Sequence, residues 1–476
     1  MIELVACVDF GSTFTKALLV DVGSGEVTAA AESPTTVDTD VLEGWSACLT
    51  ALRRVHPGVD AAPVLACSSA GGGLRVAVVG NEDLVTAEAG RRVALSSGGK
   101  VVHVGVGGLA APADTAALLS TTPDLVLLVG GTDGGNSEVL LGAATRLAAS
   151  RWPGPVVVAG NVEVAAAAVD VLTAAGVPAE RADNVVPQIG VLRPEPARSA
   201  IRTAFLRHVI GGKHLSASAE FLDMVQGPTP DVVLSGVELL AGGPGGSLPG
   251  VGDVVVVDVG GATTDVHSVV RVDPEESGLA RHVVAPTAVT RTVEGDLGMR
   301  WSAATTVELG ASAGLLAPHD AAGLVAAARV RTADPAYLPS DDADARADLA
   351  IAGLATVVAL RRHAGRARVV FGPDGRVVER DGKDLREVAL LVGSGGVLRH
   401  TSPAAALAVL TGVTGADLPG GWLLPEAPQV VVDRTYVLAA AGLLGRRHPQ
   451  TAHALLRRYV ADRRPAPAPT SPEGTA

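Results

Sequence analysis

Two stretches of the chain share one pattern of apolar and polar positions. In the first, an apolar run ends in Asp9, a short turn of Gly, Ser and Thr follows, and a second apolar run begins near Thr15. Asp258 lies 249 residues after Asp9 and also ends an apolar run, and a turn containing Gly260 separates it from another apolar segment. Each stretch predicts a strand, a tight turn and a second strand, and the repetition predicts a duplicated unit.

Between residues 101 and 230 the pattern changes to short apolar runs without alternation, several of them followed by Ala-rich helical segments. The predicted strands are 101–104, 125–129, 156–159 and 184–187, and the predicted helices are 137–150, 162–175 and 197–210. Such alternation is typical of a doubly wound parallel sheet, where ligands bind beyond the carboxyl ends of the strands. The loops at 130–136 and 160–161 are therefore a second candidate site, unless they are ordinary turns rich in Gly and Asn.

The rest of the pattern is less regular. It predicts strands at 25–31, 64–67, 74–79 and 388–392, and helices at 41–55, 86–95 and 435–444. Thr86 is the predicted N-cap of its helix. Residues 331–348 contain Pro, Ser and several Asp, and they predict an exposed acidic loop. From residue 463 onward, Pro, Ala, Ser and Thr predict a disordered tail.

Composition narrows the class of protein. A chain of 476 residues is long enough for two or three domains. Ala and Val spread along the chain supply most of its 47% hydrophobic content. No apolar run reaches the roughly 18 residues of a membrane span, and we expect no signal peptide. The net charge of −12 without a basic stripe argues against nucleic-acid binding. Three cysteines without metal-ligand spacing favour a cytoplasmic protein.

The repeated hairpins carry the chemistry of phosphate and metal binding. A Gly-rich turn lets backbone N–H groups approach phosphate oxygens, and Ser and Thr hydroxyls add donors. Asp9 and Asp258 are expected near Mg²⁺, and one of them near the attacking water. The turn residues expected around the phosphates are Gly11, Ser12, Thr13, Gly260, Gly261 and Thr263. Lys16 either points to the phosphates or is a solvated lysine at the start of a strand. The alternative is a pair of ordinary hairpins whose turns need Gly.

The two hairpins, with a later strand ending in Gly-Ser-Gly-Gly, resemble the acetate kinase, sugar kinase, Hsp70 and actin superfamily of ATPases. The phosphate 1, phosphate 2 and adenosine blocks stand in the family's order at 5–20, 254–270 and 388–399. The resemblance implies an α/β fold of duplicated actin-like, ribonuclease H-like ATPase domains with a nested doubly wound insertion. The expected divisions are 1–100 (first half of lobe I), 101–235 (insertion), 236–462 (lobe II) and 463–476 (tail).

The same resemblance implies further site residues. Gly393, Gly395 and Gly396 would pack against adenosine. Asp265 would orient the turn or the water, unless its role is structural. Asp296 would polarise the site from the opposite lobe. Glu238, upstream of Asp258, is the candidate for the hydrolytic glutamate, with a surface glutamate as the alternative.

More narrowly, the chain resembles the methylaspartate (glutamate) mutase accessory protein family, of the glutamate mutase L type. The stretches that carry this resemblance are 9–16, 127–136, 257–267, 294–300 and 391–399. It implies binding of ATP and Mg²⁺, and partnership with subunits of an adenosylcobalamin-dependent mutase that the protein assists or reactivates. The alternatives are a small-molecule kinase of the same superfamily and a scaffold that binds nucleotide without hydrolysing it. The scattered cysteines disfavour an activator with an iron–sulfur cluster.

Overall fold

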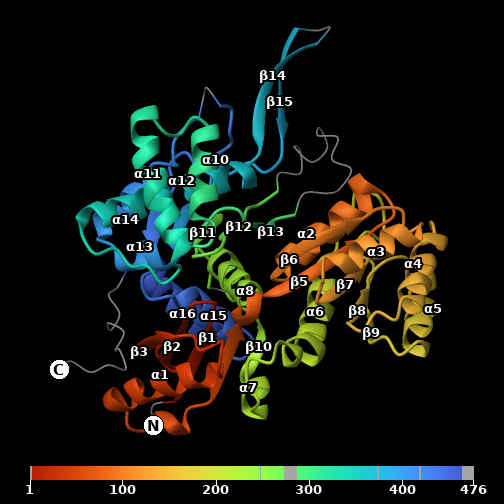
Figure 1. Ribbon diagram of the computed structural model, residues 1–476, viewed down its shortest axis with the longest axis horizontal. Helices are drawn as coiled ribbons and strands as arrows, with labels where there is room; N and C mark the ends of the chain where they lie inside the picture. Colours follow the sequence, from red (N-terminus) through yellow and green to blue (C-terminus); the bar gives the residue numbers. More distant parts are fainter. Residues whose placement is uncertain (1–2, 247, 273–286, 373–374, 418–419, 464–476) are drawn as a thin grey trace.

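The computed structural model describes residues 3–246, 248–272, 287–372, 375–417 and 420–463 (Figure 1). Apart from residue 463, the tail predicted to be disordered lies outside them. Within these ranges the chain forms three five-stranded sheets and one two-stranded hairpin, with helices packed around them. No helix of the described chain combines the length and the apolar character needed to span a bilayer.

The first sheet contains the phosphate 1 hairpin. Its strands are β1 (Leu4–Phe10), β2 (Phe14–Asp21), β3 (Glu26–Pro34), β4 (Val64–Ser68) and β10 (Val225–Pro228). They lie in the order β10-β4-β1-β2-β3, with β1, β2 and β3 antiparallel and β4 and β10 running parallel to β1. Helix α1 (Val41–Val55) has the predicted bounds, and Asp40 caps it by accepting from the N–H of Leu42.

The second sheet repeats this arrangement. Its strands are β11 (Val254–Val259), β12 (Thr264–Val269), β13 (Val289–Glu294), β16 (Leu390–Ser394) and β17 (Gln429–Val432). The order β13-β12-β11-β16-β17 has the same antiparallel meander and the same two parallel strands. The predicted duplication is therefore confirmed at the level of strand order and direction.

The third sheet is nested within the first, between β4 and β10. Its strands are β5 (Leu74–Val79), β6 (Gly99–Gly105), β7 (Leu125–Leu128), β8 (Val156–Val158) and β9 (Ala179–Arg181), in the order β6-β5-β7-β8-β9. All its pairs are parallel, which confirms a doubly wound insertion. Its helices are α2 (Glu88–Ser96), α3 (Pro112–Ser120), α4 (Glu138–Ala149) and α5 (Val162–Ala174). Figure 1 shows this unit, orange to yellow, to one side of the other two sheets.

Two sequence predictions within the insertion are wrong. The strand expected at 184–187 is a loop, and β9 precedes it. The Asn184 amide donates to the Gly131 carbonyl of another loop and accepts from the N–H of Val186 in its own segment, so the segment forms a turn instead of a strand. Thr86 is not an N-cap. The helical segment already begins at Asp83, and the Thr86 hydroxyl accepts from the N–H groups of Asn81 and Glu82.

Helices α8 (Thr229–Gly242), α15 (Val437–Gly445) and α16 (Pro449–Leu456) join the two duplicated sheets (Figure 1). One apolar core contains residues of β1, β2 and β4, of these three helices, and of β11 and β16. The helices α8 and α15 cross at glycines. A Cβ on Gly236 would overlap the carbonyl oxygen of Leu438, and one on Gly442 would overlap that of Val232.

The remaining elements surround the sheets. The second lobe carries α10 (Ala303–Ser312), α11 (Pro318–Ala333), α12 (Asp342–His363), α13 (Gly396–His400), α14 (Pro403–Thr411) and the projecting hairpin of β14 (Arg366–Gly372) and β15 (Gly375–Asp381). Helices α6 (Glu195–Ala204) and α7 (Ala219–Met224) lead back to the first sheet, and single helical turns lie at Val59–Ala61, Ala70–Gly72, Asp83–Ala87, Phe205–Val209, Gly211–Lys213 and Arg457–Ala461.

The prediction of an exposed acidic loop at 331–348 is largely wrong. Helix α11 continues to Ala333 and α12 begins at Asp342, so the connection is short. Asp341 caps α12 by accepting from the N–H groups of Ala343 and Asp344. The aspartates that suggest a loop therefore begin a helix, where carboxylates are favourable.

Candidate functional site

The turns of the two hairpins have the same geometry. The N–H of Gly11 donates to the carbonyl of Phe14 at 3.2 Å, and the N–H of Gly260 donates to that of Thr263 at 2.9 Å. A Cβ on Gly11 would lie 2.6 Å from the Phe14 oxygen, and one on Gly260 would lie 2.9 Å from the Thr263 oxygen. Each turn is therefore closed too tightly for a side chain at its first glycine. Ser12 lies exposed at the tip of the first turn.

Asp9 is buried and held by three neighbours. The hydroxyl of Thr229, the first residue of α8, donates to Oδ1 at 2.5 Å, and the thiol of Cys67 lies 3.5 Å from the same oxygen. The ammonium of Lys16 lies 3.4 Å from Oδ2. Because β1 pairs Asp9 with Lys16 on one side and with Cys67 on the other, the sheet register places these side chains together.

Lys16 points into the molecule. Its ammonium lies 4.0 Å from the centroid of the Tyr436 ring, within the range of a cation–π contact. Tyr436 immediately precedes α15, between the two duplicated sheets. Burial, followed by the charges of Asp9 and Asp258, raises the pKa of the Tyr436 hydroxyl well above its usual range. Tyr436 therefore lies near the strand-end carboxylates of both hairpins.

Asp258 occupies the position in β11 that Asp9 occupies in β1. Its partner across the hairpin is Asp265, and its parallel neighbour is Ser394. Burial and then the charge of Asp265 raise the pKa of Asp258 to about 6, while the charge of Lys16 opposes this shift. The charges of Lys16 and Asp9 both act on Asp258, so the strand-end carboxylates of the two hairpins face a common region, which we call the meeting point of the hairpins.

Asp265 is bound by a buried arginine. Arg291 of β13 donates to Oδ1 from Nη2 at 2.6 Å and from Nε at 3.1 Å. Its remaining Nη1 donates to the carbonyls of Leu95 and Gly99, at 3.0 and 3.1 Å, in the insertion. Thr263 also donates to Asp265, at 3.2 Å. Asp265 therefore orients the second turn and links it to the inserted sheet.

The carbonyls of the second turn are bound by the segment that follows β13. The N–H of Met299 donates to Gly260 at 2.9 Å, and the N–H of Arg300 donates to Gly261 at 2.8 Å. The hydroxyl of Ser302 donates to Ala262 at 2.8 Å. These bonds fix the turn from the side of the second lobe.

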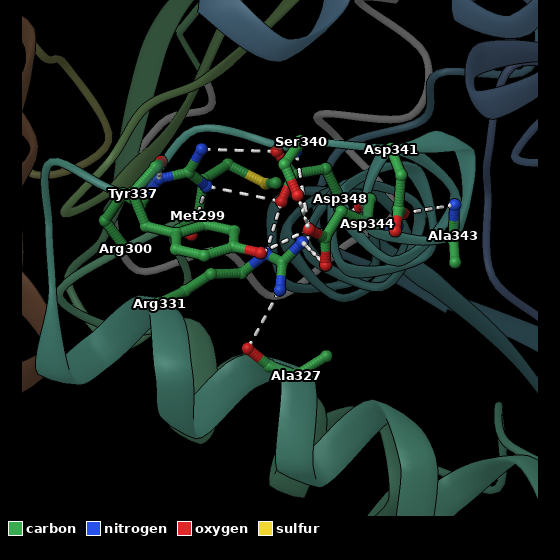
Figure 2. Close-up of polar contacts among 10 residues, drawn as sticks. All are labelled: Met299, Arg300, Ala327, Arg331, Tyr337, Ser340, Asp341, Ala343, Asp344 and Asp348. Carbon is green, nitrogen blue, oxygen red and sulfur yellow. Dashed lines mark hydrogen bonds and ion pairs between the residues drawn. The ribbon is translucent and has the colours of Figure 1, made fainter.

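Arg300 also joins this turn to the helices of the second lobe (Figure 2). Its guanidinium donates to the Tyr337 carbonyl at 3.0 Å and to the Asp348 carboxylate at 3.2 Å. The other Asp348 oxygen accepts from Nε of Arg331 at 2.5 Å. Arg331 is 1% exposed, and the Tyr337 ring lies 4.9 Å from its guanidinium. Arg300, Asp348 of α12 and Arg331 of α11 thus form a row of alternating charges that supports the second turn.

The three glycines of the predicted adenosine motif have different surroundings. A Cβ on Gly393 would lie 2.6 Å from Leu410 and 2.9 Å from Leu398, so this glycine serves packing. Gly395 has a φ of 101°, and its Cβ would overlap the Val259 carbonyl. Gly396 has no heavy atom within 4 Å of a built Cβ, and it alone of the three borders open space.

Two predicted site residues are not brought to the hairpins. Glu238 accepts from Arg198 at 2.7 Å, and it lies nine residues beyond Thr229 on α8, about 13 Å along the helix axis. Asp296 lies just after β13 and accepts from Arg362 at 2.7 Å, a pairing that lowers the pKa of Asp296. Glu238 of α8 is thus paired with Arg198 of α6, and Asp296 is paired with Arg362 of α12.

The second candidate site, the loop 130–136, is bound by asparagines of the neighbouring loops. The amide of Asn161 donates to the carbonyls of Gly135 and Asn136, at 3.3 and 3.4 Å. The amide of Asn184 donates to the Gly131 carbonyl at 3.0 Å and to Asp133 at 2.8 Å. These bonds brace the loop as a turn between strand and helix.

The sequence motifs do not identify Thr229, Tyr436 or Arg291 as part of this region. Cys67 also belongs to it through its contact with Asp9, which the motifs do not predict. The register of β1 and β4 is the signal that pairs Cys67 with Asp9. Tyr436 lies within the apolar helix predicted at 435–444, and Thr229 lies in no predicted element.

Two five-stranded sheets of equal order, joined by a shared core with α8 and α15, define a duplicated actin-like ATPase fold. The MutL protein family matches residues 5–460. Protein MutL of Clostridium tetanomorphum is 34% identical over 456 residues, covering 95% of this chain and 98% of that protein. The chain therefore belongs to the MutL protein family, and the family resemblance drawn from its motifs is confirmed.

The solved structures that resemble this chain over most of its length superpose on it only loosely. The ethanolamine utilization protein EutJ from Carboxydothermus hydrogenoformans is 10% identical, with a TM-score of 0.25, covering 95% of this chain and 89% of that one. Xylulose kinase from Bifidobacterium adolescentis is 11% identical, with a TM-score of 0.26, covering 92% and 99%. The fold assignment rests on the strand order described above.

Proposed function

We propose that this protein is an ATP-binding and ATP-hydrolysing accessory protein that reactivates an adenosylcobalamin-dependent carbon-skeleton mutase, such as glutamate mutase, in the cytoplasm. The observation that carries the proposal is the convergence of Asp9, Lys16 and Asp258 where the two hairpins meet. Membership of the MutL protein family supports the mutase as the partner. Three free, buried cysteines are compatible with a reducing compartment.

The residues at the meeting point suit Mg²⁺. The described chain assembles no group of three or more His, Cys, Asp or Glu as a metal cluster. Mg²⁺ bound with ATP needs only one or two carboxylates besides the phosphates, and Asp258 and Asp9 would supply them. Burial and then the neighbouring charge of Asp265 raise the pKa of Asp258, and a bound cation would stabilise its ionised form. When bound, Mg²⁺ would neutralise charge on the transferring phosphoryl group.

The protein's own groups would bind the nucleotide from both sides. Lys16 would contact the phosphates, and the N–H groups and hydroxyls of the two turns would donate to their oxygens. Open space at Gly396 leaves room for the nucleoside. Positioning and charge stabilisation are the main requirements of phosphoryl transfer, so these groups suffice to bind ATP in a reactive orientation.

The inserted sheet is our proposed contact for the mutase. Arg291 joins it directly to Asp265 of the second hairpin, so a change in the hairpin on nucleotide binding would reach the insertion. A two-state movement biased by ATP and reversed by hydrolysis would give the accessory protein its cycle of partner binding and release.

A second function, a scaffold that binds nucleotide without hydrolysing it, is favoured by one observation. Glu238, the candidate for the residue that activates water, forms an ion pair with Arg198 away from the hairpins. No other glutamate was predicted for that role.

Phosphate release from ATP and Mg²⁺, measured with and without an inactivated cobalamin mutase, tests these functions. We expect turnover that rises with the mutase and is lost, by at least tenfold, in Asp9→Ala and Asp258→Ala, because each removes a carboxylate from the site. Asp223→Ala, which removes an exposed carboxylate of α7, is the matched control. Tight ATP binding without turnover would identify the scaffold, and absence of ATP binding would contradict both functions.

A further inference from the structure

Tyr436 lies at the meeting point of the hairpins, yet it belongs to none of the predicted phosphate or adenosine motifs. It follows β17 and directly precedes α15. Its φ of 63° is in the left-handed region, which an aromatic residue rarely adopts, and its side chain is largely buried. Surrounding contacts must hold a residue in such a conformation, and residues of this kind cluster at functional sites.

The first of these contacts is with Lys16. The ammonium lies 4.0 Å from the ring centroid of Tyr436 and 3.4 Å from Oδ2 of Asp9. A lysine side chain has four rotatable bonds, so its ammonium is ordinarily mobile. Here an aromatic face and a carboxylate together restrict it to one position in front of Asp9.

The second contact is with Arg399 of α13, at the end of the predicted adenosine motif. Its guanidinium carbon lies 5.3 Å from the same ring centroid. Arg399 also forms an ion pair with Glu32 at 3.8 Å, and Glu32 is paired with Lys16 in the register of β2 and β3. The ring of Tyr436 therefore contacts one cation from each duplicated lobe.

We propose that Tyr436 is a positioning residue that orients the Lys16 ammonium toward the phosphates of a bound nucleoside triphosphate. The inference rests on the proposed function of ATP binding and assigns a further residue to that site. A ring that fixes Lys16 beforehand reduces the loss of side-chain freedom when the phosphates bind. Without the ring, Lys16 keeps its charge but samples many positions.

A double-mutant cycle on the full-length chain tests this role. Tyr436→Asn removes the ring but keeps a residue that tolerates the left-handed conformation. Tyr436→Phe keeps the ring, and Lys16→Met removes the cation. The Kd for ATP with Mg²⁺ is measured by calorimetry for the wild type, the single variants and Lys16→Met combined with Tyr436→Asn, and thermal unfolding checks that each is folded. If Tyr436→Asn unfolds early, Tyr436→Gly replaces it in the cycle.

We expect Tyr436→Asn to weaken ATP binding by about three- to thirtyfold, the range of a cation–π contact. Tyr436→Phe should recover most of this loss. In the Lys16→Met background, Tyr436→Asn should change the Kd by less than about twofold, because the cation that the ring orients is gone.

Two results would overturn the inference while leaving ATP binding intact. If the losses in ATP-binding free energy caused by Lys16→Met and Tyr436→Asn simply add in the double variant, the ring acts independently of Lys16. A loss in Tyr436→Phe as large as that in Tyr436→Asn would show that the hydroxyl, not the ring, is required. A wild-type protein that binds no ATP would instead contradict the proposed function, and this inference with it.

Discussion

The residue opposite the strand-end aspartate differs between the two duplicated hairpins. In the first hairpin, Lys16 lies opposite Asp9 and balances its charge. In the second, Asp265 occupies the equivalent position opposite Asp258, and its negative charge helps raise the pKa of Asp258 to about 6. Arg291 balances Asp265 from the next strand. The two hairpins thus differ at one position. The first has a lysine there, which supplies a cation, and the second has an aspartate, so its strand-end carboxylate can bind a cation.

A second lysine has an unusual environment at the edge of the second lobe. Lys383 donates to the carbonyls of Thr287 and Ala288, at 3.0 and 3.1 Å. Burial, followed by the charge of Arg92, lowers the pKa of Lys383 to about 7, and Asp253 opposes the shift. In the unfolded chain a lysine keeps its proton up to about pH 10.4. Between these pH values the unfolded state binds more protons, so the free energy of unfolding contributed by this group rises with pH.

We therefore predict that the urea midpoint of the wild type rises more steeply between about pH 7 and 9.5 than that of Lys383→Met. Methionine is a neutral side chain of similar length, so Lys383→Met removes the group whose deprotonation stabilises the folded state. Lys100→Met, at an exposed lysine, is the control and should follow the wild type. Parallel curves for the wild type and Lys383→Met would contradict the assignment.

At the scale of elements, the crossing of α8 and α15 depends on two glycines in close contact with the partner backbone. A methyl group on Gly442 would overlap the Val232 carbonyl, whereas one on Gly445, in the same helix, would lie 3.7 Å from Leu239. We predict that Gly442→Ala lowers the free energy of unfolding by about 1–3 kcal/mol despite the better helix propensity of alanine.

The matched variant Gly445→Ala should leave stability unchanged or raise it by up to about 1 kcal/mol, because only helix propensity changes. Urea unfolding of both variants provides the measurement. Equal effects of the two substitutions would show that the crossing does not require close backbone contact.

Elements with a strong apolar pattern were predictable from the sequence. Helix α1 and strand β5 have the expected bounds, and the duplicated hairpins are correctly placed, because buried strands and an amphipathic helix need little beyond local periodicity. Predictions failed where polar side chains bond over long distances. Asn184 bonds to Gly131 instead of continuing a strand, and Asp348 pairs with Arg331 instead of lying in a loop.

The candidate site was predictable only as far as its motif is repeated. Asp9 and Asp258 stand at equivalent positions of the repeat, and in the structure the charge of Asp9 acts on Asp258. Thr229 and Tyr436 come from segments more than 200 residues away from Asp9, and they reach it only through the packing of α8 and α15. A single sequence contains no local signal for such contacts.

At the scale of the whole molecule, the insertion and the second lobe meet along β13. Helix α2 of the insertion lies against this strand, and Arg291 of β13 joins Asp265 to the carbonyls of Leu95 and Gly99. Arg291 is 5% exposed, so its ion pair is screened little by solvent. The insertion is thus attached to the second lobe, which follows it in the chain, as well as to the first sheet, within which it is nested.

We predict that Arg291→Met detaches the insertion locally and lowers the free energy of unfolding by about 2–4 kcal/mol, because it leaves the half-buried Asp265 without its cation and two carbonyls of the insertion without their donor. Amide hydrogen exchange should accelerate at the end of α2 and the start of β6, while amides of β1 keep their protection. Arg53→Met, which breaks the exposed pair with Asp60, should change stability by less than about 1 kcal/mol. If Arg291→Met instead left exchange in α2 and β6 unchanged, Arg291 would not hold the insertion in place, and our proposal that it transmits nucleotide binding from the second hairpin to the insertion would be contradicted.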